Sequence, residues 1–204
     1  MRLLLLISLI IFICSCKSTY KTIKSDTEKY YPASFISEST SLLYKTKIDA
    51  FGNYFSGLLF IKPQSSDSVR IVFMSELGLK FFDFEIIGNE NKINYCLEAL
   101  NKPYIVNTLV NDFRIMLLKV DAKKIKSKQI ADSDISSIKY LKPKKTICKF
   151  QKPDDRVIEL KHKSSFSKSV RITYSDFINK IPEKINIIHR YIKLSIELNL
   201  IEKK

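Results

Sequence analysis

The chain has 204 residues, and its content of 45% hydrophobic and 27% charged residues is typical of a globular protein, which excludes a disordered chain. Its length fits one domain with a sizeable core. The formal net charge of +14 would suit a nucleic-acid-binding protein, but the lysines are spread along the chain rather than clustered, so we expect no nucleic-acid partner.

The N-terminus has the pattern of a targeting signal. Met1 and Arg2 provide a positive start, and an apolar run follows from Leu3 to Ile13, interrupted only by Ser8. A transmembrane helix needs about 20 apolar residues, so this run is too short to span a bilayer and is typical of the apolar core of a secretory signal. We therefore expect the chain to be exported.

The apolar run ends in Ile13-Cys14-Ser15-Cys16, which resembles the lipobox of bacterial lipoproteins. That resemblance implies that residues 1–15 are a signal peptide and that Cys16 is diacylated and becomes the new N-terminus. Two or more acyl chains give lasting membrane anchorage. The alternative is a plain signal peptide with an incidental cysteine.

Residues 16–40 form the expected lipidated N-terminus and tether, because they are mostly polar; a short helix around residues 26–36 is one interpretation of their pattern. No acidic residue directly follows Cys16, which favours the periplasmic face of the membrane. Residues 41–204 are expected to form the folded domain.

Two further cysteines, Cys96 and Cys148, lie in this domain. In an oxidising compartment they form a disulfide, or each is a small buried apolar residue, and the sequence leaves both interpretations open. The chain has no Cys-x-x-Cys motif, and its histidines are His162 and His189. We therefore expect no metal site and no cofactor.

From Leu43 onward apolar residues alternate with polar ones, which is the pattern of half-buried strands. Residues 44–50 and 55–61 form a predicted hairpin around Gly52-Asn53. Three further short strands are predicted at residues 69–73, 82–86 and 93–97. Strands this short, joined by short turns, indicate an antiparallel meander.

The pattern then changes to helical spacing. Pro103 suits the first turn of a helix, and apolar residues recur every three or four positions as far as Leu118. The lysine-rich segment from Asp121 to Pro143 is ambiguous, because it suits either a short helix near residues 123–130 or a loop.

Strand spacing returns at residues 146–150, 158–162 and 170–174 and again after Pro182, and the longest alternation runs from Ile192 to Leu200. A flat sheet of about ten strands with one helix would leave an apolar face in water. We therefore predict an α+β domain in which a curved antiparallel sheet curls around the amphipathic helix.

The lipoprotein signal and three strand or turn segments resemble the LolA/LolB superfamily of lipoprotein carriers. The segments are Gly57-Leu58-Leu59-Phe60-Ile61-Lys62, Ser75-Glu76-Leu77-Gly78, and Pro182-Glu183-Lys184-Ile185-Asn186-Ile187 with the alternating strand after it. The resemblance spans most of residues 43–200. It implies a half-open β-barrel with the helix in its concave side and an apolar cavity for acyl chains. Because the LolB branch is an outer-membrane lipoprotein, it also implies anchorage to the outer membrane.

The resemblance also suggests site residues. Leu77 or Leu79 is the nearest match to the exposed leucine with which LolB-like proteins push cargo into the membrane. Arg70 and Arg114 are the candidates for the arginine that holds the lid in the LolA branch. The expected lining of the cavity is apolar and alternates along strands, and the same residues would equally suit a plain core: Leu59, Ile61, Ile71, Phe73, Phe82 and Phe84.

We expect no enzymatic activity, because no nucleophile motif accompanies either histidine and because Asp83 and Glu85 alternate with apolar residues and are predicted to face solvent. The sequence thus predicts a lipid-anchored lipoprotein that binds acyl chains or lipidated proteins and helps to transfer them, with a soluble periplasmic carrier as a further partner. The alternative is a structural or interaction lipoprotein of the envelope, with a filled barrel and no lipid cargo.

Overall fold

The computed structural model describes residues 34–37, 39–118, 124–129, 134–142, 145–151, 153–163 and 169–204. The signal peptide, Cys16 and nearly all of the predicted tether and its helix lie outside the described residues. The expected lipid anchor and domain boundaries therefore stay predictions. Of the tether, residues 34–37, 39 and 40 are described, and none of them is helical.

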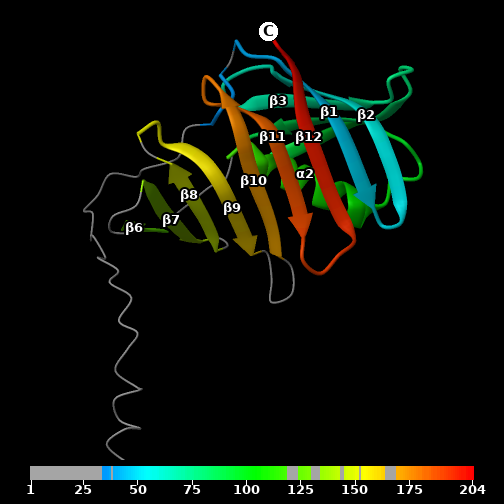
Figure 1. The fold of residues 1–204 in the computed structure, drawn as a ribbon. Helices are drawn as coiled ribbons and strands as arrows, with labels where there is room; N and C mark the ends of the chain where they lie inside the picture. Colours follow the sequence, from blue (N-terminus) through cyan, green and yellow to red (C-terminus); the bar gives the residue numbers. More distant parts are fainter. Residues whose placement is uncertain are drawn as a thin grey trace, which may run out of the picture.

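Twelve strands form one antiparallel sheet (Figure 1) in the order β5-β4-β3-β2-β1-β12-β11-β10-β9-β8-β7-β6. The first and last strands pair in its middle, and β5 and β6 are its two edges, so the sheet is not closed among the described residues. The strands are β1 (Leu42–Ala50), β2 (Asn53–Pro63), β3 (Ser68–Met74), β4 (Lys80–Ile87), β5 (Glu90–Cys96), β6 (Lys124–Gln129), β7 (Ile135–Lys142), β8 (Thr146–Gln151), β9 (Arg156–Lys163), β10 (Ser169–Ile178), β11 (Ile181–His189) and β12 (Leu194–Lys203).

Tight hairpins set the register of the strands. Ala50 pairs with Asn53, so Phe51 and Gly52 form a two-residue loop with φ of 54° and 89°. Positive φ at both central positions is the geometry that matches the twist of paired strands. The predicted first hairpin and the meander of five strands are confirmed, with the turn one residue earlier than expected.

One helix, α2 (Pro103–Met116), follows the meander, and Pro103 stands in its first turn as predicted. Its Phe113 ring lies 5.8 Å from the ring of Phe82 on β4, and the carbonyl of Met116 accepts a hydrogen bond of 2.8 Å from the Tyr174 hydroxyl on β10. The helix therefore contacts strands that lie far apart in the order of the sheet.

These contacts require a curved sheet. Six strand steps separate β4 from β10, which would place them about 29 Å apart in a flat sheet, whereas a helix with its side chains is only about 10–12 Å wide. The sheet curls so that both strands reach the same helix. Figure 1 shows α2 behind β11 and β12, on the inner side of the sheet. The predicted combination of a curved antiparallel sheet with one amphipathic helix is confirmed.

Both interpretations of the segment from residue 121 to residue 143, a short helix near residues 123–130 and a loop, are wrong for its described part. Residues 124–129 form strand β6, which pairs with β7 at residues 135–142. The alternation of Lys124, Lys126 and Lys128 with less basic residues has the period of a strand, but the high lysine content concealed it. These two strands bring the sheet from the expected ten or so to twelve.

Candidate functional site

The six predicted cavity residues lie together in the core. They form two rows across β2, β3 and β4, with Leu59 opposite Phe73 and Phe73 opposite Phe82 in one row. All six are 0% exposed, and the rings of Phe82 and Phe84 stack at 4.5 Å. Their complete burial leaves no solvent-accessible space at these side chains, and none of the six lines the pocket described below. Their role as lining for an acyl chain stays a prediction.

The predicted membrane-inserting turn joins β3 to β4. Leu77 is 99% exposed, and Leu79 is 56% exposed. The turn is nevertheless ordered, because the backbone N–H of Gly78 donates to the Ser75 carbonyl and that of Leu79 donates to Ser75 Oγ, both at 3.0 Å. An ion pair of 3.0 Å between Lys45 and Glu76 ties the turn to β1. The structure therefore presents Leu77 on a constrained turn.

A glycine on β2 packs directly against the backbone at the start of this turn. Gly57 lies so close to the end of β3 that a Cβ at this position would collide with the backbone of Met74 and Ser75. Only a residue without a side chain permits this approach. The Gly57-Leu58-Leu59 segment thus positions the turn that carries Leu77.

The two candidate lid arginines have different surroundings. Arg70 makes a bidentate hydrogen bond to Asp83, at 2.9 and 2.8 Å, and Lys80 Nζ lies 3.2 Å from the same carboxylate. The prediction that Asp83 faces solvent is wrong, because these cations and Asn94 cover it and leave it 1% exposed. The hydrogen bond from Arg70 holds the pKa of Asp83 at about 2, below its ordinary value.

Arg114 instead connects the helix to the sheet. Its Nη2 donates to the carbonyls of Asn89 and Glu90 at 3.3 and 2.9 Å, in and just after the turn between β4 and β5. Burial lowers the pKa of this guanidinium. Of the two arginines, Arg114 is therefore the one that fastens α2 to the surrounding sheet.

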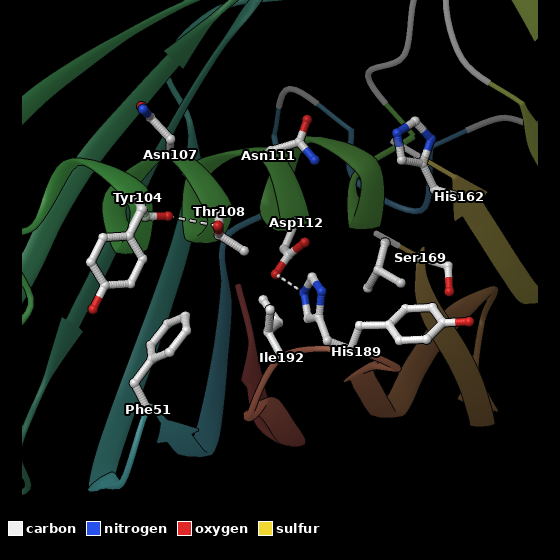
Figure 2. A pocket seen from close by; sticks show the side chains of 12 residues that line it. Phe51, Tyr104, Asn107, Thr108, Asn111, Asp112, His162, Ser169, His189 and Ile192 are labelled. Carbon is white, nitrogen blue, oxygen red and sulfur yellow. Dashed lines mark hydrogen bonds and ion pairs between the residues drawn. The ribbon is translucent and has the colours of Figure 1, made fainter. Parts of the chain in front are cut away.

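A pocket of about 400 Å³ lies between α2 and the strand ends of β9, β10 and β11 (Figure 2). The helix contributes residues spaced for one face of a helix, and the other residues come from the strand ends and two turns. The pocket is lined by Phe51, Tyr104, Asn107, Thr108, Asn111, Asp112, His162, Ser169, Val170, His189, Tyr191 and Ile192.

A buried ionisable pair forms part of this pocket. His189 Nε2 lies 2.7 Å from Asp112 Oδ2, and Figure 2 shows the two side chains pointing toward one another. Asp112 is 0% exposed, so burial raises the pKa of its carboxyl above the ordinary value, and the hydrogen bond to His189 opposes that rise. Such a pair can hold a proton and orient a hydrogen-bonding ligand.

The second histidine lies at the end of β9. Its Nδ1 is 2.7 Å from Thr146 Oγ1 on β8, and the residue is 5% exposed. From the sequence, the two histidines were considered for a metal site and for catalysis, and neither pointed to this pocket; His189 is the last residue of β11. The signal that points to the pocket is the polar stripe of α2, with Asn107, Thr108 and Asn111 opposite its apolar face.

The two cysteines are not bonded to each other. Cys148 is buried and Cys96 half-buried, and both are free thiols. Burial raises the pKa of Cys148 to about 12 and also raises that of Cys96. Of the two interpretations, the structure therefore favours small apolar residues.

Within the described part of the chain, no helix has both the length and the apolar character that crossing a membrane requires. The same residues contain no group of three or more His, Cys, Asp or Glu side chains arranged to hold a metal ion.

The fold is similar to the crystal structure of a putative outer membrane lipoprotein-sorting protein domain from Vibrio parahaemolyticus. The two chains are 9% identical, the similarity covers 81% of this chain and 84% of that one, and the TM-score is 0.49. No protein-family model and no curated protein matches the sequence. The similarity concerns the path of the backbone, and it assigns no role to any residue.

Proposed function

We propose that this protein is a non-enzymatic lipoprotein of the outer membrane that binds acyl chains or lipidated proteins at the periplasmic face and helps to pass them to the membrane. In this proposal Cys16 carries the lipid anchor, and a soluble periplasmic carrier delivers the cargo. The observation that supports it best is Leu77, which is 99% exposed at the tip of a constrained turn.

Exposure of a leucine in this way has a physical cost in water and a benefit at a membrane. Full burial of one leucine side chain stabilises by about 1.5–3 kcal/mol. The hydrogen bonds to Ser75 and the ion pair between Lys45 and Glu76 already order the turn, so insertion would lose little conformational entropy. Leu79, at 56% exposed, extends the apolar surface of the same turn.

The proposed acyl site is the space between α2 and the sheet, which we take to be a half-open barrel. The apolar face of α2 meets the row that contains Phe73 and Phe82, through the contact of Phe113 with Phe82 at 5.8 Å between ring centres. An acyl chain would replace the helix in these contacts, so the helix has to move away for cargo to enter. Arg114 resists this movement through its bonds to Asn89 and Glu90, as do the Asp112–His189 contact and the hydrogen bond from Tyr174 to Met116.

The test is lipid binding by a chain that lacks residues 1–16, purified without detergent. Lipids extracted from it are identified by mass spectrometry, and a fluorescent fatty acid is titrated into the delipidated protein. The proposal predicts co-purified acyl chains or saturable binding of the fatty acid. Absence of both would contradict it.

A second function is favoured by the filled core. The six predicted cavity residues are 0% exposed, so the domain as it stands has no open space along these rows. That packing suits an envelope lipoprotein that holds a complex together through protein contacts. Recovery of a stoichiometric protein partner from cross-linked envelopes, together with no lipid binding, would support this function over the first.

A further inference from the structure

The pocket beside α2 includes none of the six apolar core residues of the proposed acyl site, and its walls combine aromatic and apolar side chains with several polar groups. The helix presents the side chains of Asn107 and Asn111, and the sheet presents His189, which lies against Asp112. Asn side chains both donate and accept hydrogen bonds. A pocket of about 400 Å³ with such convergent polar groups is of the size and kind that binds small molecules.

One buried polar atom in this pocket has no hydrogen-bond partner among the described residues. Asp112 is 0% exposed, and its Oδ1 has no hydrogen-bond partner among the described residues, while Oδ2 is engaged by His189. A buried acceptor without a donor is costly, so such an atom normally receives a hydrogen bond from a ligand or from water. A hydroxyl group would supply that donor.

Aromatic rings flank the polar groups. Tyr104 and Tyr191 are 54% and 57% exposed, and the ring of Tyr104 is held edge-on by Phe51 at 5.1 Å. Figure 2 shows Phe51 and Tyr104 together on one side of the pocket. Exposed rings beside hydrogen-bonding groups suit a ligand with one apolar face and many polar substituents, because the ring face takes the apolar side.

The charge of the lining indicates a neutral ligand. Among the residues that the structure describes, no lysine or arginine lines the pocket, and the Arg190 guanidinium lies over the Tyr191 ring, 5.2 Å from its centre. An anion beside Asp112 would therefore find no lysine or arginine in the described lining to hold it. A cation would have to separate Asp112 from His189 and approach a chain of net charge +14. A neutral molecule with several hydroxyl groups meets neither obstacle.

We propose that this pocket is a binding site for a saccharide, in which Tyr104 and Tyr191 receive the apolar face of the sugar ring and Asn107, Asn111 and Asp112 bond its hydroxyl groups. The six apolar core residues and the Leu77 turn are not part of this pocket, so substitutions in its lining test the saccharide proposal separately from the acyl-chain function.

The experiment is saturation-transfer difference NMR on the full chain in phosphatidylcholine nanodiscs, with empty nanodiscs as the blank. The probes are D-glucose, D-galactose, D-mannose and N-acetyl-D-glucosamine, and choline and acetate serve as charged comparisons. We expect saturation transfer to at least one sugar and none to choline or acetate. Transfer to no sugar, or transfer to a charged probe alone, would overturn the proposal.

Substitutions in the pocket lining test whether an observed sugar signal comes from this site. Tyr104→Ala and Asn111→Ala should each weaken sugar binding about tenfold, the change that corresponds to one lost contact of ordinary strength. Tyr54→Ala is the matched control, because Tyr54 is 63% exposed on β2 and does not line the pocket. Asp112→Asn, which keeps the shape of the side chain, should weaken binding as well. Equal affinity in Tyr104→Ala and in Tyr54→Ala would show that the sugar binds elsewhere.

Discussion

His189 Nε2 lies 2.7 Å from Asp112 Oδ2, although the two residues are 77 positions apart, and this contact joins the end of β11 to the middle of α2. Arg114 joins the last turn of the same helix to the turn between β4 and β5. One side of the sheet thus holds the helix through a buried ionisable pair, and the other holds it through backbone carbonyls. A change of pH should affect the first attachment, and substitution of Arg114 should affect the second.

The Asp112–His189 attachment should depend on pH. The pKa of Asp112 is raised in the folded state, so the folded protein binds more protons than the unfolded chain at pH values above the unfolded pKa. Stability from this group is present at low pH and is lost as pH rises through the folded pKa. Asp112→Asn removes this loss, so its free energy of unfolding relative to the wild type should increase between pH 4 and pH 8. A difference that stays constant in urea titrations over this range would contradict the assignment.

Asp83 should show the opposite dependence. Its pKa is lowered from 3.8 to about 2, so its contribution is present above the unfolded pKa and is lost as pH falls from about 4 through about 2. The side chains of Arg70 and Lys80 are 45% and 41% exposed and are screened by solvent, so we expect about 1 kcal/mol rather than the full shift. Asp83→Asn should therefore destabilise at pH 7 and have little effect near pH 2. Asp49→Asn, at an exposed position of β1, is the control in the same denaturant titrations.

Gly57→Ala should disturb the turn that carries Leu77. The new methyl group would collide with the backbone of Met74 and Ser75, and such overpacking costs about 1–3 kcal/mol. Thermal unfolding measures the loss, and amide chemical shifts of residues 75–79 report the displacement of the turn. Ser56→Ala, at the exposed neighbouring position, should leave both unchanged. Identical shifts in the two variants would contradict the role of Gly57.

Arg114→Met should loosen the end of α2. The change leaves an unbranched apolar side chain but removes both hydrogen bonds to the carbonyls of Asn89 and Glu90, a loss of about 1 kcal/mol for partly exposed bonds. Amide hydrogen exchange should become faster in the last turn of the helix. Arg171→Met is the control, because Arg171 is 59% exposed and bonds only on the strand surface, to Glu159 at 3.4 Å. If Arg114 restrains cargo entry, the same variant should also bind a fluorescent fatty acid more readily.

The sheet and helix were predictable because their signals are local. β1 alternates buried side chains with more accessible ones along its whole length, and the apolar residues of α2 recur at helical spacing, so each element shows its period in the sequence. Strand β6 was less predictable, because it is rich in lysine and its two faces differ little in hydrophobicity. The curvature followed from the need to cover one apolar face with one helix.

The pocket was not predictable in the same way. Asp112 belongs to a helix and His189 to the end of a strand, and only the curl of the sheet brings them together. Asp83 was misjudged for a related reason, because its cover comes from Arg70 on a neighbouring strand and from Lys80. Strand alternation predicts which face a residue is on, and it cannot predict which long side chains fold over that face.

Leu77 is the most direct test of the proposed transfer function. The measurement is the rate at which a lipidated protein moves from a soluble carrier complex into liposomes that hold the full chain. Leu77→Asp should slow this transfer about tenfold or more, since a leucine that enters the bilayer contributes about 1.5–3 kcal/mol. Ile201→Asp, at an apolar position of β12 that is 54% exposed, should leave the rate unchanged. Equal rates for Leu77→Asp and the wild type would contradict the account.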